Sequence, residues 1–299
     1  MRDKLQQRIQ RYGWDLAADA YEPLWRAQLS GAQDALLAGV ALRPGERVLD
    51  VACGTGLVAL RAAQAVGAGG RVVGTDLSGA MVAAAAMRAA ASGLGHAGFE
   101  RMDAESLALP DACFDVALCA LGLMYMPDPE RALREMRRVL RPGGRLGVAI
   151  WGERSSCGWA PVFEIVDAEV SSDVCPMFFR LGATHALAEA CVEAGFADVV
   201  AQRIDATLFY ADGEQACDAA FVGGPVALAW SRFDAEARRR ARARYLAAIA
   251  PWQQGDGYRV PASFIVATAT AAPLASTSAH PLPSTAPPDA GAQVPQNVR

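Results

Sequence analysis

The chain has 299 residues, with 28 lysine and arginine residues against 32 aspartate and glutamate residues, so its formal net charge is −4. This length allows one large domain or two small ones, and it buries enough surface to form a core without disulfides or metals. The acidic balance argues against a protein that binds nucleic acid through a basic face, and no apolar run reaches the roughly 18–20 residues of a membrane-spanning helix.

The seven cysteines include no Cys-x-x-Cys pair. This pattern favours reduced thiols and predicts a cytoplasmic location. The N-terminus is too polar for a secretory signal. The alanine- and arginine-rich composition suggests a bacterial source with a GC-rich genome.

Short β-branched runs alternate with helical stretches over residues 43–152, a pattern typical of a parallel α/β sheet. We predict strands at 47–52, 71–76, 99–102, 114–119 and 145–150. Helices are predicted at 57–66, 79–91 and 129–140, with Ser78 and Asp128 as N-caps and a stop at 141–144. Right-handed crossovers make this a doubly wound, Rossmann-like sheet with helices on both faces.

Beyond Trp151 the alternation of strands and helices is less regular. The sequence there predicts helices at 184–194, 213–221 and 234–249, and strands at 199–210 and 263–268. We therefore expect a helical cap over 1–42, a main α/β domain over 43–270 and a lid at about 152–183. The segment 271–299 is rich in Pro, Ala, Ser and Thr and is predicted to be a disordered tail.

A glycine-rich loop, Asp50-Val-Ala-Cys-Gly-Thr-Gly56, joins the first strand to the first helix of the sheet. Backbone N–H groups and a helix N-terminus can meet a ligand there, and glycines allow close approach. Asp76 follows at about the distance expected of a ribose-binding acid. The loop by itself fits a nicotinamide dinucleotide as well as another adenosine ligand.

The negative charge of the loop region discriminates between these two kinds of ligand. Asp50 would repel a pyrophosphate, whereas a ligand with an ammonium and a sulfonium group would be attracted. Asp50, Asp76 and Asp103 follow three successive strands, so the three acids favour S-adenosylmethionine as the cofactor.

Four motifs in order carry a family resemblance, namely 48–56, 73–78, 103–110 and 135–144. With them comes an upstream helix, Trp14-Asp-Leu-Ala-Ala-Asp-Ala-Tyr-Glu-Pro-Leu-Trp25. The chain resembles class I S-adenosylmethionine-dependent methyltransferases, in the style of the ubiquinone/menaquinone-biosynthesis group. The resemblance covers residues 12–152. It implies seven strands in the order 3-2-1-4-5-7-6, with the last one antiparallel.

On this resemblance, cofactor-binding residues follow the first four strands and are Asp50, Ala52, Gly54, Thr55, Gly56, Asp76, Leu77, Asp103, Ala104, Cys119 and Ala120. Asp50 and the glycine loop would hold the methionine part, Asp76 the ribose and Asp103 the adenine edge. Tyr21 would close over the cofactor.

The predicted activity is methyl transfer to carbon or oxygen of a small, largely apolar or aromatic metabolite. Candidate substrate contacts are Trp25, Met124, Trp151, Cys157, Trp159 and Cys175. Methyl transfer needs mainly positioning and exclusion of water, so no catalytic triad is expected. The catalytic base is undetermined, with His185 and Tyr21 as candidates, and no metal is expected.

Three alternatives stay open. Cys157 and Cys175 could hold a soft metalloid or act in thiol methylation. The chain could instead be a reductase that binds NAD(P), or a protein that binds the cofactor without turnover. We expect a small-molecule acceptor, no nucleic acid and no membrane span, and the sequence leaves a homodimer open.

Overall fold

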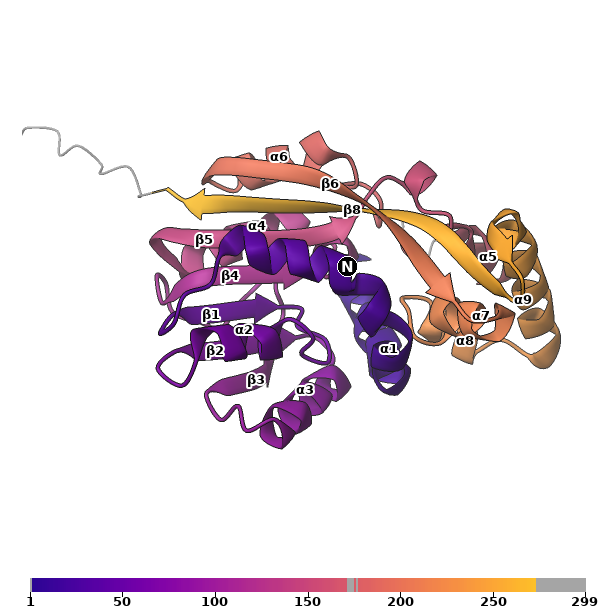
Figure 1. The fold of residues 1–299 in the computed structure, drawn as a ribbon, viewed down its shortest axis with the longest axis horizontal. Coiled ribbons are helices and arrows are strands. Elements are labelled where there is room, and N and C mark those ends of the chain that lie inside the picture. Colours follow the sequence, from indigo (N-terminus) through magenta and orange to yellow (C-terminus); the bar gives the residue numbers. More distant parts are fainter. Residues whose placement is uncertain (1, 171–174, 176, 273–299) are drawn as a thin grey trace, which may run out of the picture.

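The structure, a computed structural model, describes residues 2–170, 175 and 177–272. It is built around one sheet with the strand order β3-β2-β1-β4-β5-β8-β6, and helices cover both of its faces (Figure 1). This is the predicted order and the predicted Rossmann-like class. The strand β7 (Gln253–Gln254) is a two-residue addition that pairs with β8.

The parallel half of the sheet contains β1 (Arg47–Val51), β2 (Arg71–Asp76), β3 (Ala97–Arg101), β4 (Phe114–Ala120) and β5 (Leu140–Trp151). Its helices are α2 (Ala59–Val66), α3 (Gly79–Ala91) and α4 (Pro129–Val139). β1 and β4 are buried along most of their length, as expected for strands covered on both faces.

The two predicted N-caps are confirmed. Ser78 Oγ accepts from the N–H of Met81 at the start of α3, at 3.1 Å. Asp128 Oδ1 accepts from the N–H of Arg131 at the start of α4, at 2.8 Å. Both satisfy backbone donors that have no partner inside the helix.

The helix α4 ends before 141–144 as predicted, but the following strand starts earlier than predicted, because these residues already belong to β5. Leu140 already pairs with Phe114 of β4, and the register shifts before the next pair. Gly143 has φ 76°. A glycine in this left-handed conformation accommodates the irregularity without ending the strand.

The antiparallel half is longer than the sequence predicts. β6 (Phe196–Tyr210) and β8 (Gly257–Ala271) each have 15 residues and pair with each other, and β8 also pairs antiparallel with β5. Pro261 lies inside β8, opposite Thr207. Because Pro261 and Arg259 interrupt the apolar pattern, the sequence did not predict the outer part of β8. The predicted tail therefore starts too early, because Ala271 lies in the sheet, and residues 273–299 lie outside the described residues.

The far ends of β6 and β8 carry a helical group beside the sheet (Figure 1). It consists of α5 (Pro161–Val170), α7 (Gly213–Phe221), α8 (Ala227–Ser231) and α9 (Ala235–Ile249). α6 (Thr184–Glu193) packs on β6 instead. Part of the predicted lid, 171–174 and 176, lies outside the described residues.

The long helix α1 (Arg2–Val40) crosses the molecule and joins the two halves. Asp15 Oδ1 accepts from Ser78 Oγ at 2.6 Å, and Glu22 forms an ion pair with Arg88. At its other end, Arg145 Nε donates to the carbonyl of Val40 at 2.8 Å. No described helix is long and apolar enough to cross a membrane.

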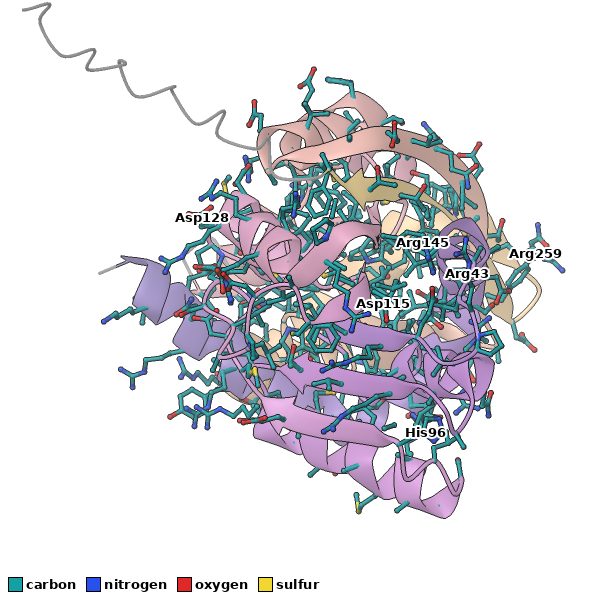
Figure 2. All side chains as sticks on the ribbon, turned by 90° about the vertical axis from the view of Figure 1, so that its left-hand side faces the viewer. Arg43, His96, Asp115, Asp128, Arg145 and Arg259 are labelled. Atoms are coloured by element: carbon teal, nitrogen blue, oxygen red, sulfur yellow. The ribbon has the colours of Figure 1, made fainter. Side chains whose placement is uncertain are left out.

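Arg145 also fixes the loop between α1 and β1. Its Nη2 donates to Glu46 at 2.8 and 2.7 Å, and the backbone N–H of Arg43 donates to the same carboxylate at 2.8 Å. Arg43 and Arg145, which both donate to Glu46, are labelled in Figure 2. The end of α1 is thereby held against the sheet.

Candidate active site

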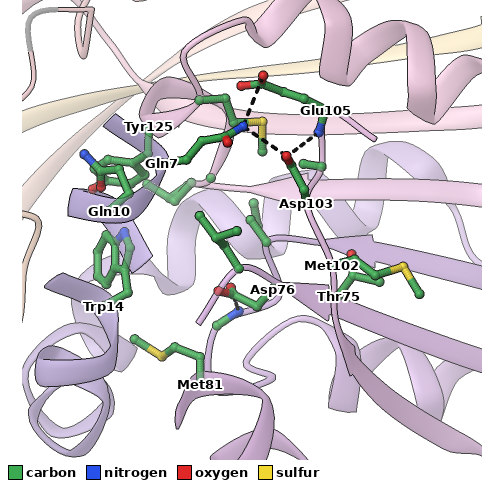
Figure 3. A pocket seen from close by; sticks show the side chains of 18 of the residues that line it. Gln7, Gln10, Trp14, Thr75, Asp76, Met81, Met102, Asp103, Glu105 and Tyr125 are labelled. Atoms are coloured by element: carbon green, nitrogen blue, oxygen red, sulfur yellow. Dashed lines mark hydrogen bonds between the residues drawn. The ribbon is translucent and has the colours of Figure 1, made fainter. Parts of the chain in front are cut away.

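A cavity lies where the carboxyl ends of β1, β2 and β4 meet α1 (Figure 3). It encloses about 760 Å³, counting the part open to solvent. Of the predicted cofactor residues, those that line it are Tyr21, Ala52, Gly54, Asp76, Leu77, Asp103, Ala104 and Ala120. We call it the cofactor cavity. A small adjoining cavity is lined by Asp50 together with Tyr21, Ala52, Gly54 and Ala120.

The backbone at this edge has an unusual conformation. Ala52 and Leu121 have φ of 55° and 62°, and Gly54 has φ 53°. A Cβ on Gly122 would lie 2.4 Å from Ala52 Cβ, so only glycine fits there. Left-handed backbone at non-glycine residues costs about 1–3 kcal/mol and is concentrated at functional sites.

Asp76 is held by two backbone donors. Its Oδ2 accepts from the N–H of Gly54 at 2.9 Å and its Oδ1 from that of Ser78 at 2.8 Å. Burial nevertheless raises the pKa of Asp76 to about 6, against the opposing effect of these hydrogen bonds. Each carboxylate oxygen retains a lone pair for a hydroxyl donor.

Asp50 is 1% exposed, and neither of its carboxylate oxygens has a hydrogen-bond partner in the described part of the chain. Burial raises the pKa of Asp50 to about 8, against the opposing effect of the nearby backbone N–H of Ala59, and the carboxylate of Asp76 adds to the rise. A buried acceptor without a partner is costly, and a cationic donor would relieve the cost.

Asp103 lines the cofactor cavity and contacts Gln7 of α1 (Figure 3). Its Oδ1 accepts from the N–H of Glu105 at 2.9 Å, and its Oδ2 accepts from Gln7 Nε2 at 3.0 Å. Gln7 therefore links the first turns of α1 to the loop after β3.

Besides Asp50, three predicted cofactor residues do not line the cofactor cavity. Thr55 is buried, and both its carbonyl and its hydroxyl accept from Arg88. Gly56 donates its N–H to the carbonyl of Cys53 and serves the turn. Cys119 is buried behind the cavity floor, which its neighbour Ala120 lines.

A second cavity adjoins the first, and six of the ten described residues that line it are aromatic. It encloses about 330 Å³, again counting open space, and is lined by Trp14, Tyr21, Trp25, Leu29, Leu121, Tyr125, Trp151, Trp159, Gly224 and Pro225. We call it the aromatic cavity. Trp25, Trp151 and Trp159 are the predicted substrate residues that it contains. Trp14, Tyr21, Leu121 and Tyr125 line both cavities.

Four other candidates line neither of these cavities. Met124 is buried next to Tyr125 in the chain. His185 lies in the first turn of α6, which contributes no residue to either cavity. Cys157 Sγ donates to the carbonyl of Ser263, whereas Cys175 Sγ accepts from Gln10 Nε2 at 3.4 Å. In the described part of the chain, no group of three or more His, Cys, Asp or Glu residues could hold a metal.

The sequence analysis missed several lining residues. They lie on α1 and are Gln7, Gln10 and Trp14. The spacing of positions 7, 10, 14 and 21 places them on one helix face. That spacing was a readable signal, but only the fold shows what the face covers.

Part of the chain is similar in sequence to known methyltransferases. The family model described as "Methyltransferase domain" matches residues 48–144. A ubiquinone/menaquinone biosynthesis C-methyltransferase of Ectopseudomonas mendocina is 46% identical over 111 residues, covering 37% of this chain and 43% of that protein. A 2-phytyl-1,4-naphthoquinone methyltransferase of Synechococcus elongatus is 43% identical over 110 residues, covering 36% and 47%.

Residues 48–144 are a class I S-adenosylmethionine-dependent methyltransferase domain. The matches cover less than half the length of these two relatives. S-adenosylmethionine is accordingly the cofactor of the domain.

Solved structures extend the likeness of fold beyond this domain. The [4+2]-cyclase SpnF has a TM-score of 0.53 at 28% identity, covering 79% of this chain and 78% of that one. A phosphoethanolamine N-methyltransferase of Haemonchus contortus, solved with S-adenosylhomocysteine, has a TM-score of 0.55 at 17% identity, covering 86% and 57%. The latter shows the fold alone.

The residues present fit this cofactor. The free carboxylate of Asp50 suits an ammonium group, and Asp76 retains acceptor capacity for ribose hydroxyls. A pyrophosphate beside the Asp50 and Asp76 carboxylates would instead meet like charge, which disfavours NAD(P).

Proposed function

We propose that the chain transfers a methyl group from S-adenosylmethionine to a small, largely apolar ring metabolite of the quinone type, at carbon or oxygen. The observation that carries the proposal is the contact of the two cavities. Four side chains line both, so a cofactor in one and an acceptor in the other would meet there. The names of the two quinone-related relatives support the acceptor class.

Cofactor binding is proposed to rest on the three acids. Asp76 would accept from the ribose hydroxyls, Asp50 would face the ammonium end, and Asp103 with Leu77 and Ala104 would flank the adenine. S-adenosylmethionine, when bound, supplies a methyl group already activated by its sulfonium. The protein's task is then to orient the two reactants and to exclude water.

The wall between the cavities would position the acceptor. Trp14 packs edge-on against Tyr125, with ring centroids 5.0 Å apart, and against Tyr21, at 5.8 Å. No carboxylate, imidazole or thiol lies among the described residues that line the aromatic cavity. Burial raises the pKa values of Tyr21 and Tyr125, so both hydroxyls stay protonated at neutral pH. We propose that the acceptor is itself nucleophilic and that no side chain in the described part of that cavity acts as a base.

The test pairs binding with turnover. Calorimetry should show S-adenosylhomocysteine binding to the protein and no binding of NAD(P). Incubation with labelled S-adenosylmethionine and reduced naphthoquinones should give a methylated ring product, identified by mass spectrometry. Binding of S-adenosylhomocysteine without any methyl transfer would favour another chemistry on this fold, and the cyclase with a similar structure is a precedent.

A further inference from the structure

Tyrosine hydroxyls at the junction of the two cavities, and an indole N–H in the aromatic cavity, have no partners among the described residues. The hydroxyls of Tyr21 and Tyr125 make no hydrogen bond within the part of the chain that the structure describes, and both rings are half-buried. Trp25 is 6% exposed, and its Nε1–H has no partner there either. All three residues line the aromatic cavity.

These groups are held in place by ring contacts. Tyr125 lies between Trp14 and Phe178, with centroids 5.0 and 5.2 Å away. Trp25 packs edge-on against Trp151 and Trp159, at 6.0 and 6.3 Å. Fixed rings keep their polar atoms at fixed positions, so a ligand meets a preorganised set of donors.

The described lining of the aromatic cavity carries no charged side chain. A charged group such as a phosphate would lose its hydration there without an opposite charge to replace it. A planar ring, in contrast, can pack on the indoles. A single oxygen on that ring would satisfy donors that otherwise stay unpaired in a buried site.

We propose that Tyr21 and Tyr125, assisted by Trp25, are specificity-determining residues that bind an oxygen on an uncharged, planar ring acceptor. This inference rests on the proposed function, since it takes the aromatic cavity as the acceptor site. It adds that the oxygen is selected by donors at the junction, next to the cofactor. A ring without that oxygen would fit the cavity but leave the donors unpaired.

The experiment compares two probes, 2-naphthol and naphthalene, which differ by one oxygen. Binding is measured by fluorescence titration or ligand-observed NMR with S-adenosylhomocysteine present. We expect 2-naphthol to bind the unaltered protein about fivefold more tightly than naphthalene, as one net hydrogen bond allows. Tyr125→Phe and Tyr21→Phe should each reduce this preference, largely by weakening 2-naphthol binding.

Tyr245→Phe is the matched control, because Tyr245 is a buried tyrosine of α9 whose hydroxyl also lacks a partner and which lines neither cavity. It should leave both affinities unchanged. Naphthalene binding as tightly as 2-naphthol, or equal losses for both probes in Tyr125→Phe, would overturn the inference. Failure of the proposed function would appear separately, as absent S-adenosylhomocysteine binding or absent methyl transfer. Thermal melts verify that each variant is folded.

Discussion

The two cavities leave opposite kinds of buried polar atoms without partners. In the cofactor cavity and its small neighbour, the buried free atoms are acceptors, namely both oxygens of Asp50 and Oε1 of Gln10. In the aromatic cavity, the buried free atoms are donors, Nε1 of Trp25 and Nε1 of Trp159. An unpaired buried polar group costs about 1–3 kcal/mol, so native proteins retain few of them. The contrast suggests a donor-rich cation for one cavity and an oxygen-bearing ring for the other.

The cavities also differ in their origin along the chain. The cofactor cavity is formed mostly by short loops that directly follow strands of the parallel sheet. The aromatic cavity combines α1, the loop after β4, the end of β5, the segment before α5 and the loop after α7. If the difference is functional, a change in one cavity should leave the other largely intact.

The largest expected effect concerns Trp159, the centre of the aromatic cluster. It contacts Trp25, Trp151, Phe163 and Phe178 with centroids 4.8 to 6.3 Å away. Trp159→Ala should lower the free energy of unfolding by about 3–5 kcal/mol, as loss of a buried aromatic ring does. Denaturant titration measures this, and calorimetry on the folded variant should give S-adenosylhomocysteine affinity within threefold of the unaltered protein. A collapse of cofactor affinity would show that the cavities are not independent.

The second effect concerns Asp76. Asp76→Ala removes the acceptor proposed for two ribose hydroxyls and leaves the N–H groups of Gly54 and Ser78 without their partner. Calorimetry should show S-adenosylhomocysteine affinity reduced about 100-fold, because hydrogen bonds to a charged acceptor are strong. Asp205→Ala, an exposed site on β6, is the comparison and should change nothing. Unchanged affinity in Asp76→Ala would contradict the ribose assignment.

The third effect is a pH dependence from Asp50. Its folded-state pKa is raised to about 8, whereas an unfolded aspartate titrates near 4, so the folded state holds the proton more tightly. The resulting stabilisation is complete below about pH 4 and is lost as pH rises through 8. In the absence of cofactor, the melting temperature should therefore fall between pH 5 and 9 more steeply for the unaltered protein than for Asp50→Asn.

The Asp50 comparison has a second readout. Asp50→Asn should be the more stable protein at pH 9 by several degrees, since the amide has no charge to bury. Thermal melts of both proteins across this range decide the matter. Parallel melting curves at all pH values would mean that Asp50 is not the group that titrates.

Much of the parallel half could be read directly from the sequence. β-branched runs bounded by glycine turns located β1, β2 and β4 to within a residue, and Ser78 and Asp128 located two helix starts. These signals are local, because a strand buried on both faces must be apolar throughout. Asp50 and Asp76 were likewise placed at one edge, since carboxyl ends of parallel strands meet there.

The sequence by itself determined the methyltransferase resemblance, the strand order that this resemblance implies and the position of the acids, because continuous segments of the chain carry the motifs. Only the tertiary structure decided that α1 covers the cofactor cavity, with Gln7 reaching Asp103, and that Tyr125 stands between the two cavities. It also decided that Cys157 and Cys175 have separate partners and that Met124 lines neither the cofactor nor the aromatic cavity. These facts depend on contacts between distant segments, which long-range packing fixes and local patterns do not encode.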